Sequence, residues 1–361
     1  MLKNGEVMSL DEIEDWEARL DRQDACLNGA VLDRPVVVMS CDRPGVCPLE
    51  EKKFRSQKER WFDVENQVRQ EKHKIESTLY FGDALPSTTP NLGPDYFASL
   101  FGGELEFEES TSYIRHWLGE WEDWDSKIAY SEQSVYFQKM EELYGAFLEQ
   151  LSGKAYVGYP DLHPGSDCLA AFRDPMNFNF DILEQPDEIA KGLKTVTQQF
   201  FKTYAHYSAK LSAAGQPCCS WLGIVSRHMY HIPSSDFSYM ISPSSFDELF
   251  LEGLREENQC FEKNVHHLDG PGCLNHLESL LGIDEMNMIQ WVWGTGNGRA
   301  SDHIDTLKRI QQAGRGLHLP VELDELNLVM NELHPEGVWL EVDISTPDEA
   351  KAVLNQVRGW T

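Results

Sequence analysis

The sequence lacks the features of a membrane-spanning or secreted protein. No apolar run approaches the roughly 20 residues that cross a bilayer, and residues 1–20 lack the charged-then-apolar pattern of a secretion signal. The eight cysteines are scattered without a CxxC pair, and we expect free thiols. The sequence therefore predicts a cytoplasmic protein without a membrane partner.

Basic residues are also scarce. The chain has 31 Lys and Arg against 60 Asp and Glu, which gives a formal net charge of −29. This charge repels phosphate backbones and anionic membranes, and it predicts no nucleic-acid partner. A strongly anionic ligand would need a local cluster of Arg or Lys. We expect most of the acidic side chains to form a solvated surface.

No GxGxxG sequence follows the first apolar strand, so the sequence does not favour a dinucleotide-binding open sheet. An open sheet stays the alternative to the architecture that we predict. Instead, strand and helix patterns alternate along the 361 residues. This alternation predicts the α/β class and a (β/α)8 TIM barrel. The expected strands cover residues 34–40, 78–83, 154–159, 216–223, 264–268, 286–293, 316–320 and 337–342.

The sequence predicts a single barrel domain over residues 1–361. Residues 1–33 form an expected N-terminal helical extension, and residues 84–130, rich in turn residues and aromatics, form an expected loop or hairpin insertion. Helical periodicity predicts further helices. They cover residues 49–77, 131–152 and 187–215.

Residues 264–275, "NVHHLDGPGCLN", place two candidate catalytic side chains at the end of a strand. His267 and Asp269 are two apart, so on a strand they face the same way, with α-carbons about 7 Å apart. They could bind a metal, form a hydrogen-bonded pair or act as an acid/base pair. Asp236 is a third candidate, as a base or an amine-binding group; its alternative role is to cap nearby amides.

Aromatic and polar side chains at other strand ends predict a substrate pocket. Aromatic walls suit a methylated cation or an aryl ether, although most aromatic residues on barrel strands belong to the core. The expected substrate-binding residues are Tyr159, Asp161, Trp221, Trp291, Trp293 and His318.

Four segments resemble, in sequence and order, the uroporphyrinogen decarboxylase superfamily. They are "YPDLHPGSDCLAAFRD", "DFSYMISPSSFDELF", "HHLDGPGCLNHLESLLGID" and "AGRGLHLPVE". The resemblance covers about residues 150–360 and implies a (β/α)8 barrel. That superfamily includes tetrapyrrole decarboxylases and cobalamin-dependent methyltransferases, and this chain is more similar to the second group. The Arg-rich "RQAGR" stretch of the decarboxylases is missing, with only Arg43 nearby, which disfavours uroporphyrinogen as a substrate.

The resemblance also implies a metal site. In the thiol-directed methyltransferases of the superfamily, a His-x-Cys-Gly motif after the fifth strand binds zinc. In this sequence His267 takes the place of the His and Asp269 that of the Cys, and Glu341 lies about where a third ligand is expected. His, Asp and Glu can all hold zinc at about 2.0–2.2 Å.

The function that the resemblance implies is that of a corrinoid-dependent methyltransferase, a demethylase. It would move a methyl group from a small methylated amine or ether to a partner corrinoid protein, because the chain has no DxHxxG cobalamin-binding motif. Two alternatives stay open. One is a decarboxylase or lyase that acts on a substrate other than uroporphyrinogen, and the other is a non-catalytic small-molecule-binding barrel.

Overall fold

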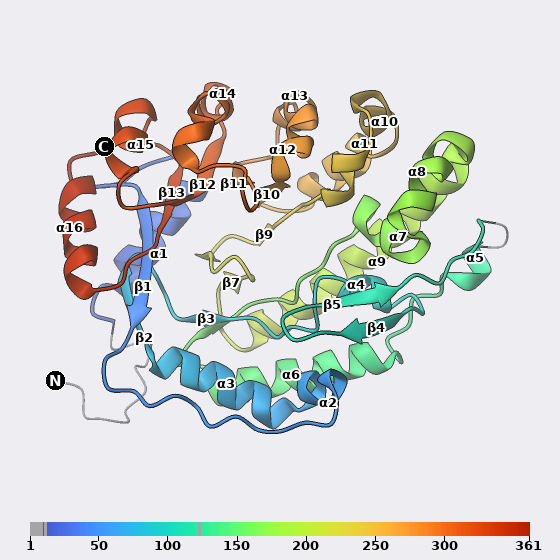
Figure 1. Cartoon of the computed structure of the whole chain (residues 1–361), viewed down its shortest axis with the longest axis horizontal. Helices are drawn as coiled ribbons and strands as arrows, with labels where there is room; N and C mark the ends of the chain where they lie inside the picture. Colours follow the sequence, from blue (N-terminus) through green and yellow to red (C-terminus); the bar gives the residue numbers. More distant parts are fainter. Residues whose placement is uncertain (1–9, 11–12, 122–123) are drawn as a thin grey trace.

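A seven-stranded sheet forms the centre of the computed structural model, which describes Leu10, residues 13–121 and residues 124–361. Its strand order is β2-β1-β13-β12-β11-β10-β9 (Figure 1). Five of the six neighbouring pairs are parallel, and β2 is antiparallel to β1. The strands are β1 (Val36–Asp42), β2 (Thr78–Gly82), β9 (Tyr230–His231), β10 (Lys263–Asp269), β11 (Met288–Val292), β12 (Gly316–Val321) and β13 (Val338–Val342).

Within the described residues, short strands form three further two-stranded sheets. Backbone hydrogen bonds extend one of them, because Gly158 N donates to Thr88 O at 2.7 Å and Tyr159 N donates to Cys219 O at 2.9 Å. As a result, β3, β6 and β7 lie side by side. The pairs are β3 (Ser87–Thr88) with β6 (Tyr156–Val157), β4 (Glu104–Phe107) with β5 (Ser112–Arg115), and β7 (Cys218–Cys219) with β8 (Val225–Ser226).

The predicted alternation is confirmed as a mixed α/β fold with a largely parallel sheet, but the ladders of the described residues do not form a continuous eight-stranded barrel. The predicted strand at 78–83 pairs antiparallel with β1. The strands predicted at 154–159 and 216–223 shorten to two residues each. Pro160 and Pro217 flank these strands, and proline has no N–H to donate to a ladder.

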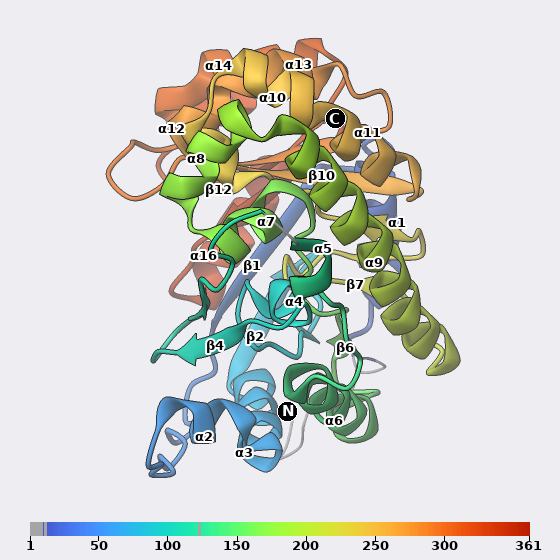
Figure 2. The same cartoon turned by 90° about the vertical axis from the view of Figure 1, so that its right-hand side faces the viewer.

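Helices cover the outer side of the parallel strands, as Figures 1 and 2 show for α13 and α14 beside β11 and β12. In the part of the chain that the structure describes, no helix is both long and apolar enough to cross a membrane. The α-helices are α1 (Trp16–Leu27), α2 (Gln57–Phe62), α3 (Val64–Glu76), α4 (Tyr96–Ser99), α5 (Trp124–Lys127), α6 (Val135–Leu151), α7 (Gly165–Arg173), α8 (Pro175–Glu184), α9 (Pro186–Ala213), α10 (Pro243–Leu249), α11 (Leu251–Gln259), α12 (Gly270–Cys273), α13 (Leu277–Leu281), α14 (Ile304–Gln312), α15 (Leu326–Glu332) and α16 (Pro347–Val357). The 3₁₀ helices are η2 (Asp236–Met240), η3 (Leu274–His276) and η4 (Ala300–His303).

The predicted helices are found with small changes of boundary. The helix predicted at 131–152 is α6, and the one predicted at 187–215 is α9, which ends before Gly215 at φ 68°. The stretch 49–77 divides into α2 and α3 at Asp63. The Asp63 carboxylate accepts a hydrogen bond from the backbone N of Asn66 at 2.8 Å and so caps α3.

A buried carboxylate ties the N-terminal residues to the sheet. The Asp83 side chain is fully buried and forms ion pairs with Arg34 and with Arg22, the latter at 3.0 Å. It also accepts a hydrogen bond from the backbone N of Val37 on β1 at 2.9 Å. These contacts satisfy the carboxylate on several sides, which is what allows a charge at this depth.

The strands enclose an inner space that positions the site. Val265, Met288 and Trp339, from three strands, belong to one buried apolar cluster on this inner side. Alternate residues of a strand face the same side. The residues two positions after Val265 and Met288, His267 and Gln290, therefore also face the inner space.

Candidate active site

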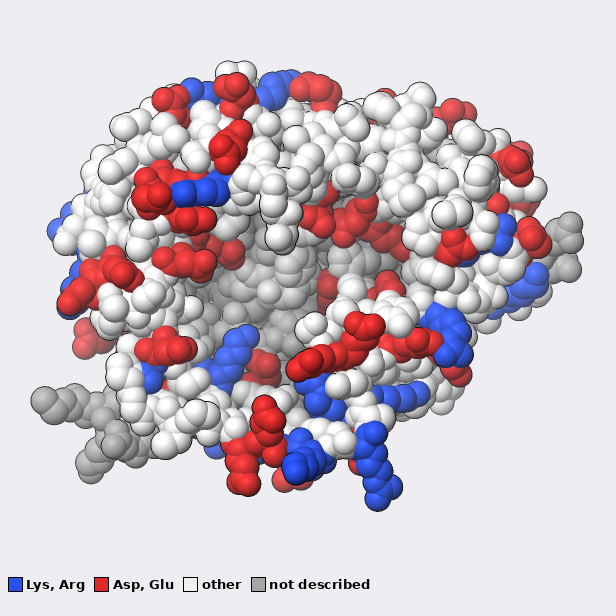
Figure 3. All heavy atoms as spheres, in the orientation of Figure 1, with Lys and Arg blue, Asp and Glu red and all other residues white. Residues whose placement is uncertain are grey.

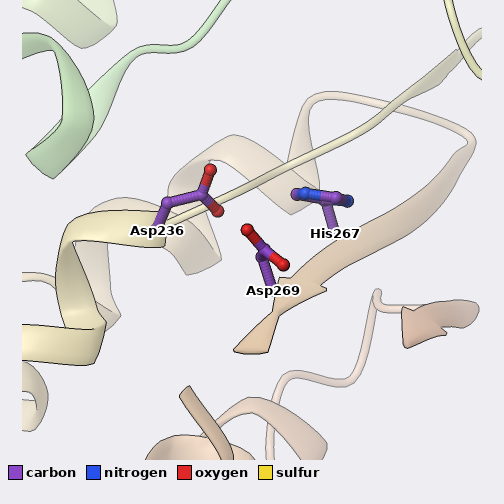
Figure 4. A group of neighbouring side chains, drawn as sticks. All are labelled: Asp236, His267 and Asp269. Carbon is purple, nitrogen blue, oxygen red and sulfur yellow. The ribbon is translucent and has the colours of Figure 1, made fainter. Parts of the chain in front are cut away.

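Three side chains converge where β10 ends. His267 and Asp269 lie on β10, and Asp236 begins η2. Figure 4 shows the three side chains pointing toward one another. One potential ligand atom from each lies within 4.8 Å of those of the other two. The structure thus brings Asp236 and the predicted pair His267 and Asp269 together as a possible metal site.

A neighbouring strand orients the His267 ring. His267 and Gln290 are paired in register on β10 and β11. Nδ1 of His267 lies 2.6 Å from Oε1 of Gln290, so Nδ1 carries the proton and donates it. The Nε2 lone pair is then available to a metal, as is usual for metal-ligating histidines. Trp221 contacts the same ring in a T-shaped arrangement, with centroids 5.5 Å apart.

Asp167 on α7 holds the loop that carries Asp236. Its carboxylate accepts hydrogen bonds from Ser234 Oγ at 3.0 Å, from Asp236 N at 3.1 Å and from Phe237 N at 2.9 Å. Burial raises the pKa of Asp236 to about 6, and the negative charge of Asp167 adds to this effect. Asp236 is thus fixed by its backbone, and its carboxyl group can hold a proton near neutral pH.

His163 is the positively charged member of this group. Its Nε2 lies 2.8 Å from Asp161 Oδ1, and its Nδ1 lies 2.7 Å from Ser234 Oγ. Burial lowers the pKa of His163, but the charges of Asp161, Asp167 and Asp236 outweigh it and raise the pKa to about 10. The protonated ring therefore partly balances the surrounding carboxylates.

A cavity of about 800 Å³ opens in front of Asp236 and Asp269. Asp95 and Asp167 also line it, and its described lining residues include no Lys or Arg. Figure 3 shows this face of the molecule hollowed at its centre, with acidic side chains on both sides of the hollow. Such a lining favours a cationic or neutral ligand over a polycarboxylate.

A second cavity, of about 530 Å³, lies beside Asp161 and Trp221. It is lined mainly by hydroxyl, amide and charged side chains, Arg60 and Lys74 among them. Trp221 contacts both this cavity and the His267 ring. The two predicted substrate-binding residues Asp161 and Trp221 thus lie at the site.

The other predicted residues in the inner space are His318 and Glu341. His318 pairs in register with Gln290, and it is fully buried. Its Nε2 lies 3.5 Å from Glu341 Oε1. Burial lowers the pKa of His318 to about 3, so the ring is neutral. Burial and, to a smaller extent, the negative charge of Asp343 raise the pKa of Glu341 to about 7. Glu341 is not among the three converging side chains.

No family model matches the chain, and no curated protein matches it by sequence. Its fold does match solved structures. One of these is described as a methyltransferase from Methanosarcina mazei. It superimposes with a TM-score of 0.59 at 14% sequence identity, over 94% of this chain and 98% of the other. This likeness shows that the two proteins share a fold.

Three predicted substrate-binding aromatics lie away from the cavities. Tyr159 is 2% exposed, and its ring contacts Tyr204 within the core. Trp291 is fully buried, and Trp293 stacks on His303 with centroids 5.7 Å apart. Trp291 lies on β11, and Trp293 follows the last residue of that strand, Val292. Trp291 is on the face of β11 opposite to the one that carries Gln290, because side chains alternate along a strand. These three side chains therefore line neither of the two cavities.

Gln290 is the site residue that the sequence analysis missed. It stands in the apolar stretch "MNMIQWVWG" and is 7% exposed. An amide in an otherwise apolar buried strand needs a hydrogen-bonding partner, and this was the available signal. The sequence could not name the partner, because only the register of β10 and β11 brings Gln290 to His267.

Proposed function

We propose that this protein is a methyltransferase whose centre is the cluster of Asp236, His267 and Asp269. The observation that carries the proposal is the convergence of these side chains at the end of β10, beside an 800 Å³ cavity. The shared fold with the Methanosarcina mazei methyltransferase supports it. We further propose that the six strands of the main sheet that pair in parallel, together with β3 and β6, form a distorted (β/α)8 barrel of the uroporphyrinogen decarboxylase type.

The donor set fits a divalent metal such as zinc. Ligand atoms that share an ion at about 2.0–2.2 Å lie about 3–4 Å apart, and these three lie within 4.8 Å of one another. Small side-chain rotations would close the set. Carboxylate oxygens and imidazole nitrogen are both zinc ligands in proteins, and the metal would act as a Lewis acid on the atom that the methyl group leaves.

The proposed reaction moves a methyl group from a small methylated substrate to the reduced cobalt of a partner corrinoid protein. The bond between the methyl carbon and its nitrogen or oxygen breaks, and its electron pair stays with the departing atom, while the reduced cobalt of the acceptor would supply the electron pair for the new bond to carbon. That atom must be made a better leaving group. Without a metal, the Asp236 carboxyl group, with a pKa of about 6, can supply a proton to it.

The remaining residues orient and enclose the substrate. Gln290 holds the His267 ring, Asp167 holds the loop of Asp236, and Trp221 forms a wall beside the ring. The acidic lining of the cavity argues against uroporphyrinogen, whose carboxylates would face Asp95, Asp167, Asp236 and Asp269.

The test combines metal analysis with a methyl-transfer assay. Purified protein should contain about one zinc per chain, and His267→Ala and Asp236→Asn should lose it. With reduced cobalamin as the acceptor, methylation from trimethylamine, methanol or methoxybenzene should fall roughly a hundred-fold or more in these variants. His228→Ala is the matched control, because His228 is partly exposed and pairs with Glu262 instead.

The assay also decides between the alternatives. A folded protein that carries no metal, transfers no methyl group and is unaffected by His267→Ala is a non-catalytic binding protein. Turnover of a porphyrinogen or another carboxylate substrate would identify a decarboxylase.

A further inference from the structure

The inner space contains two polar side chains, His318 and Glu341, that have no good partner. We call them the inner pair. Neither ring nitrogen of His318 has a hydrogen-bond partner among the described residues, although the side chain is fully buried. The ring stacks on Trp339, with centroids 5.5 Å apart and planes at 21°. Its Nε2 is 3.5 Å from Glu341 Oε1, which is too long for a good hydrogen bond.

Glu341 lacks a balancing cation. Within the described ranges its one ion-pair contact is with His318, which is neutral. Its register neighbours are Val38 and Pro320, both apolar. A carboxylate placed among protein groups without a cation is costly, and a bound cation removes that cost.

A ligand can reach this carboxylate. The Glu341 side chain is 42% exposed, while the His318 side chain behind it is closed off. Glu341 lies on the same face of β13 as Trp339, which belongs to the inner cluster, so the exposed part opens to the inner space. The negative charge of Asp343, two residues along the chain, also acts on Glu341, and the whole chain has a net charge of −29. These charges attract a cation to the inner pair.

We propose that Glu341 binds the protonated amine of the substrate, and that His318 is a positioning residue whose Nε2 closes the 3.5 Å gap to Glu341 Oε1 and donates to it once the amine is bound. This inference rests on the proposed function and narrows it, because the methyl donor is then a protonated methylated amine rather than an ether. The proton already makes its nitrogen a leaving group, so the amine departs neutral with the electron pair of the broken C–N bond, and no Lewis acid acts on that nitrogen. An ammonium N–H donates to Glu341 and neutralises it. An ether carries neither a charge nor an N–H and gains nothing from the inner pair.

The test compares trimethylammonium chloride with tert-butanol, which is close in size and neutral. Binding of each to the purified full chain is measured by calorimetry or by ligand NMR. A charged hydrogen bond favours the cation roughly ten-fold or more, and we expect Glu341→Gln to abolish that preference. Glu336→Gln is the control. It makes the same change at an exposed position just before β13 and should keep the preference for the cation.

His318 is tested by conservative rescue. We expect His318→Leu to lower the preference for the cation at an unchanged melting temperature, and His318→Gln, which keeps a donor, to restore part of it. The preference of the wild-type protein for trimethylammonium over tert-butanol is measured without any variant, so this part of the test does not require a variant to fold. A wild-type protein without the preference, a Glu341→Gln variant that keeps it, or one that loses zinc instead of amine binding would overturn the inference.

The methyl-transfer assay separates this inference from the proposed function. Transfer from methanol or methoxybenzene without amine binding refutes the inference and leaves the function. A preference for the amine without any methyl transfer supports the amine-binding role of Glu341 and refutes the proposed methyltransferase function.

Discussion

Replacing Gln290 by Leu tests whether the candidate metal site depends on the orientation of His267. Leucine has a similar size, so the variant removes the 2.6 Å hydrogen bond to Nδ1 and leaves the strand otherwise unchanged. The His267 ring then loses both its fixed proton position and its fixed plane. Removing such an outer partner of a metal-ligating histidine lowers metal affinity about 10–100-fold, and we expect a loss of zinc affinity in this range.

Protein stability should change much less than zinc affinity. An unsatisfied N–H on His267 costs about 1–3 kcal/mol, and the buried methyl groups of leucine offset about 1–2 kcal/mol of that. The two readouts therefore separate a local effect on the metal site from a general loss of folding.

Zinc affinity is measured by competition with a chromophoric chelator, and stability by urea unfolding. Gln198→Leu, at an exposed position on α9, is the control and should leave zinc binding unchanged. The double variant His267→Ala/Gln290→Leu should bind zinc no more weakly than His267→Ala. A folded Gln290→Leu variant with wild-type zinc affinity would refute the assignment of Gln290 to the orientation of His267.

Three further predictions concern stability, each measured by urea unfolding. The folded pKa of His163 is about 10, above its ordinary 6.5, so its stabilising contribution is complete below pH 6.5 and is lost as the pH rises to 10. Between pH 6.5 and 10, the free energy of unfolding of the wild type should fall by up to about 1.4 kcal/mol per pH unit more than that of His163→Gln. Equal pH dependence of the two proteins would contradict the raised pKa of His163. Asp83→Asn should cost about 3–5 kcal/mol, because it leaves the partly buried Arg22 and Arg34 without the carboxylate that pairs with both. A cost below about 1 kcal/mol would count against these ion pairs. Gly158→Ala would place its Cβ 2.4 Å from a threonine oxygen and 3.1 Å from a backbone atom, so it should lower the free energy of unfolding by about 1–3 kcal/mol. Gly145→Ala in α6 meets nothing within 4 Å and should leave stability unchanged or increase it. The packing argument is refuted if Gly145→Ala is the more destabilising of the two.

The sequence by itself determined the order of the main strands and helices, and it placed two of the site residues, His267 and Asp269, on one face of a strand. Apolar, β-branched runs are local signals, and they located β1, β10, β11, β12 and β13 to within a few residues. The two-residue spacing of His267 and Asp269 likewise placed them on one face of a strand, because alternation of side chains is a local property.

The tertiary structure decided everything that depends on which strands are neighbours. The antiparallel pairing of β2, the contact of Gln290 with His267 and the approach of Asp236 all join segments far apart in the sequence. It also decided which face of β11 meets the inner space, and so moved Trp291 from the expected pocket to the core. The sequence of a strand shows that its side chains alternate between two faces, but which face meets the inner space depends on how the strand packs against the rest of the fold.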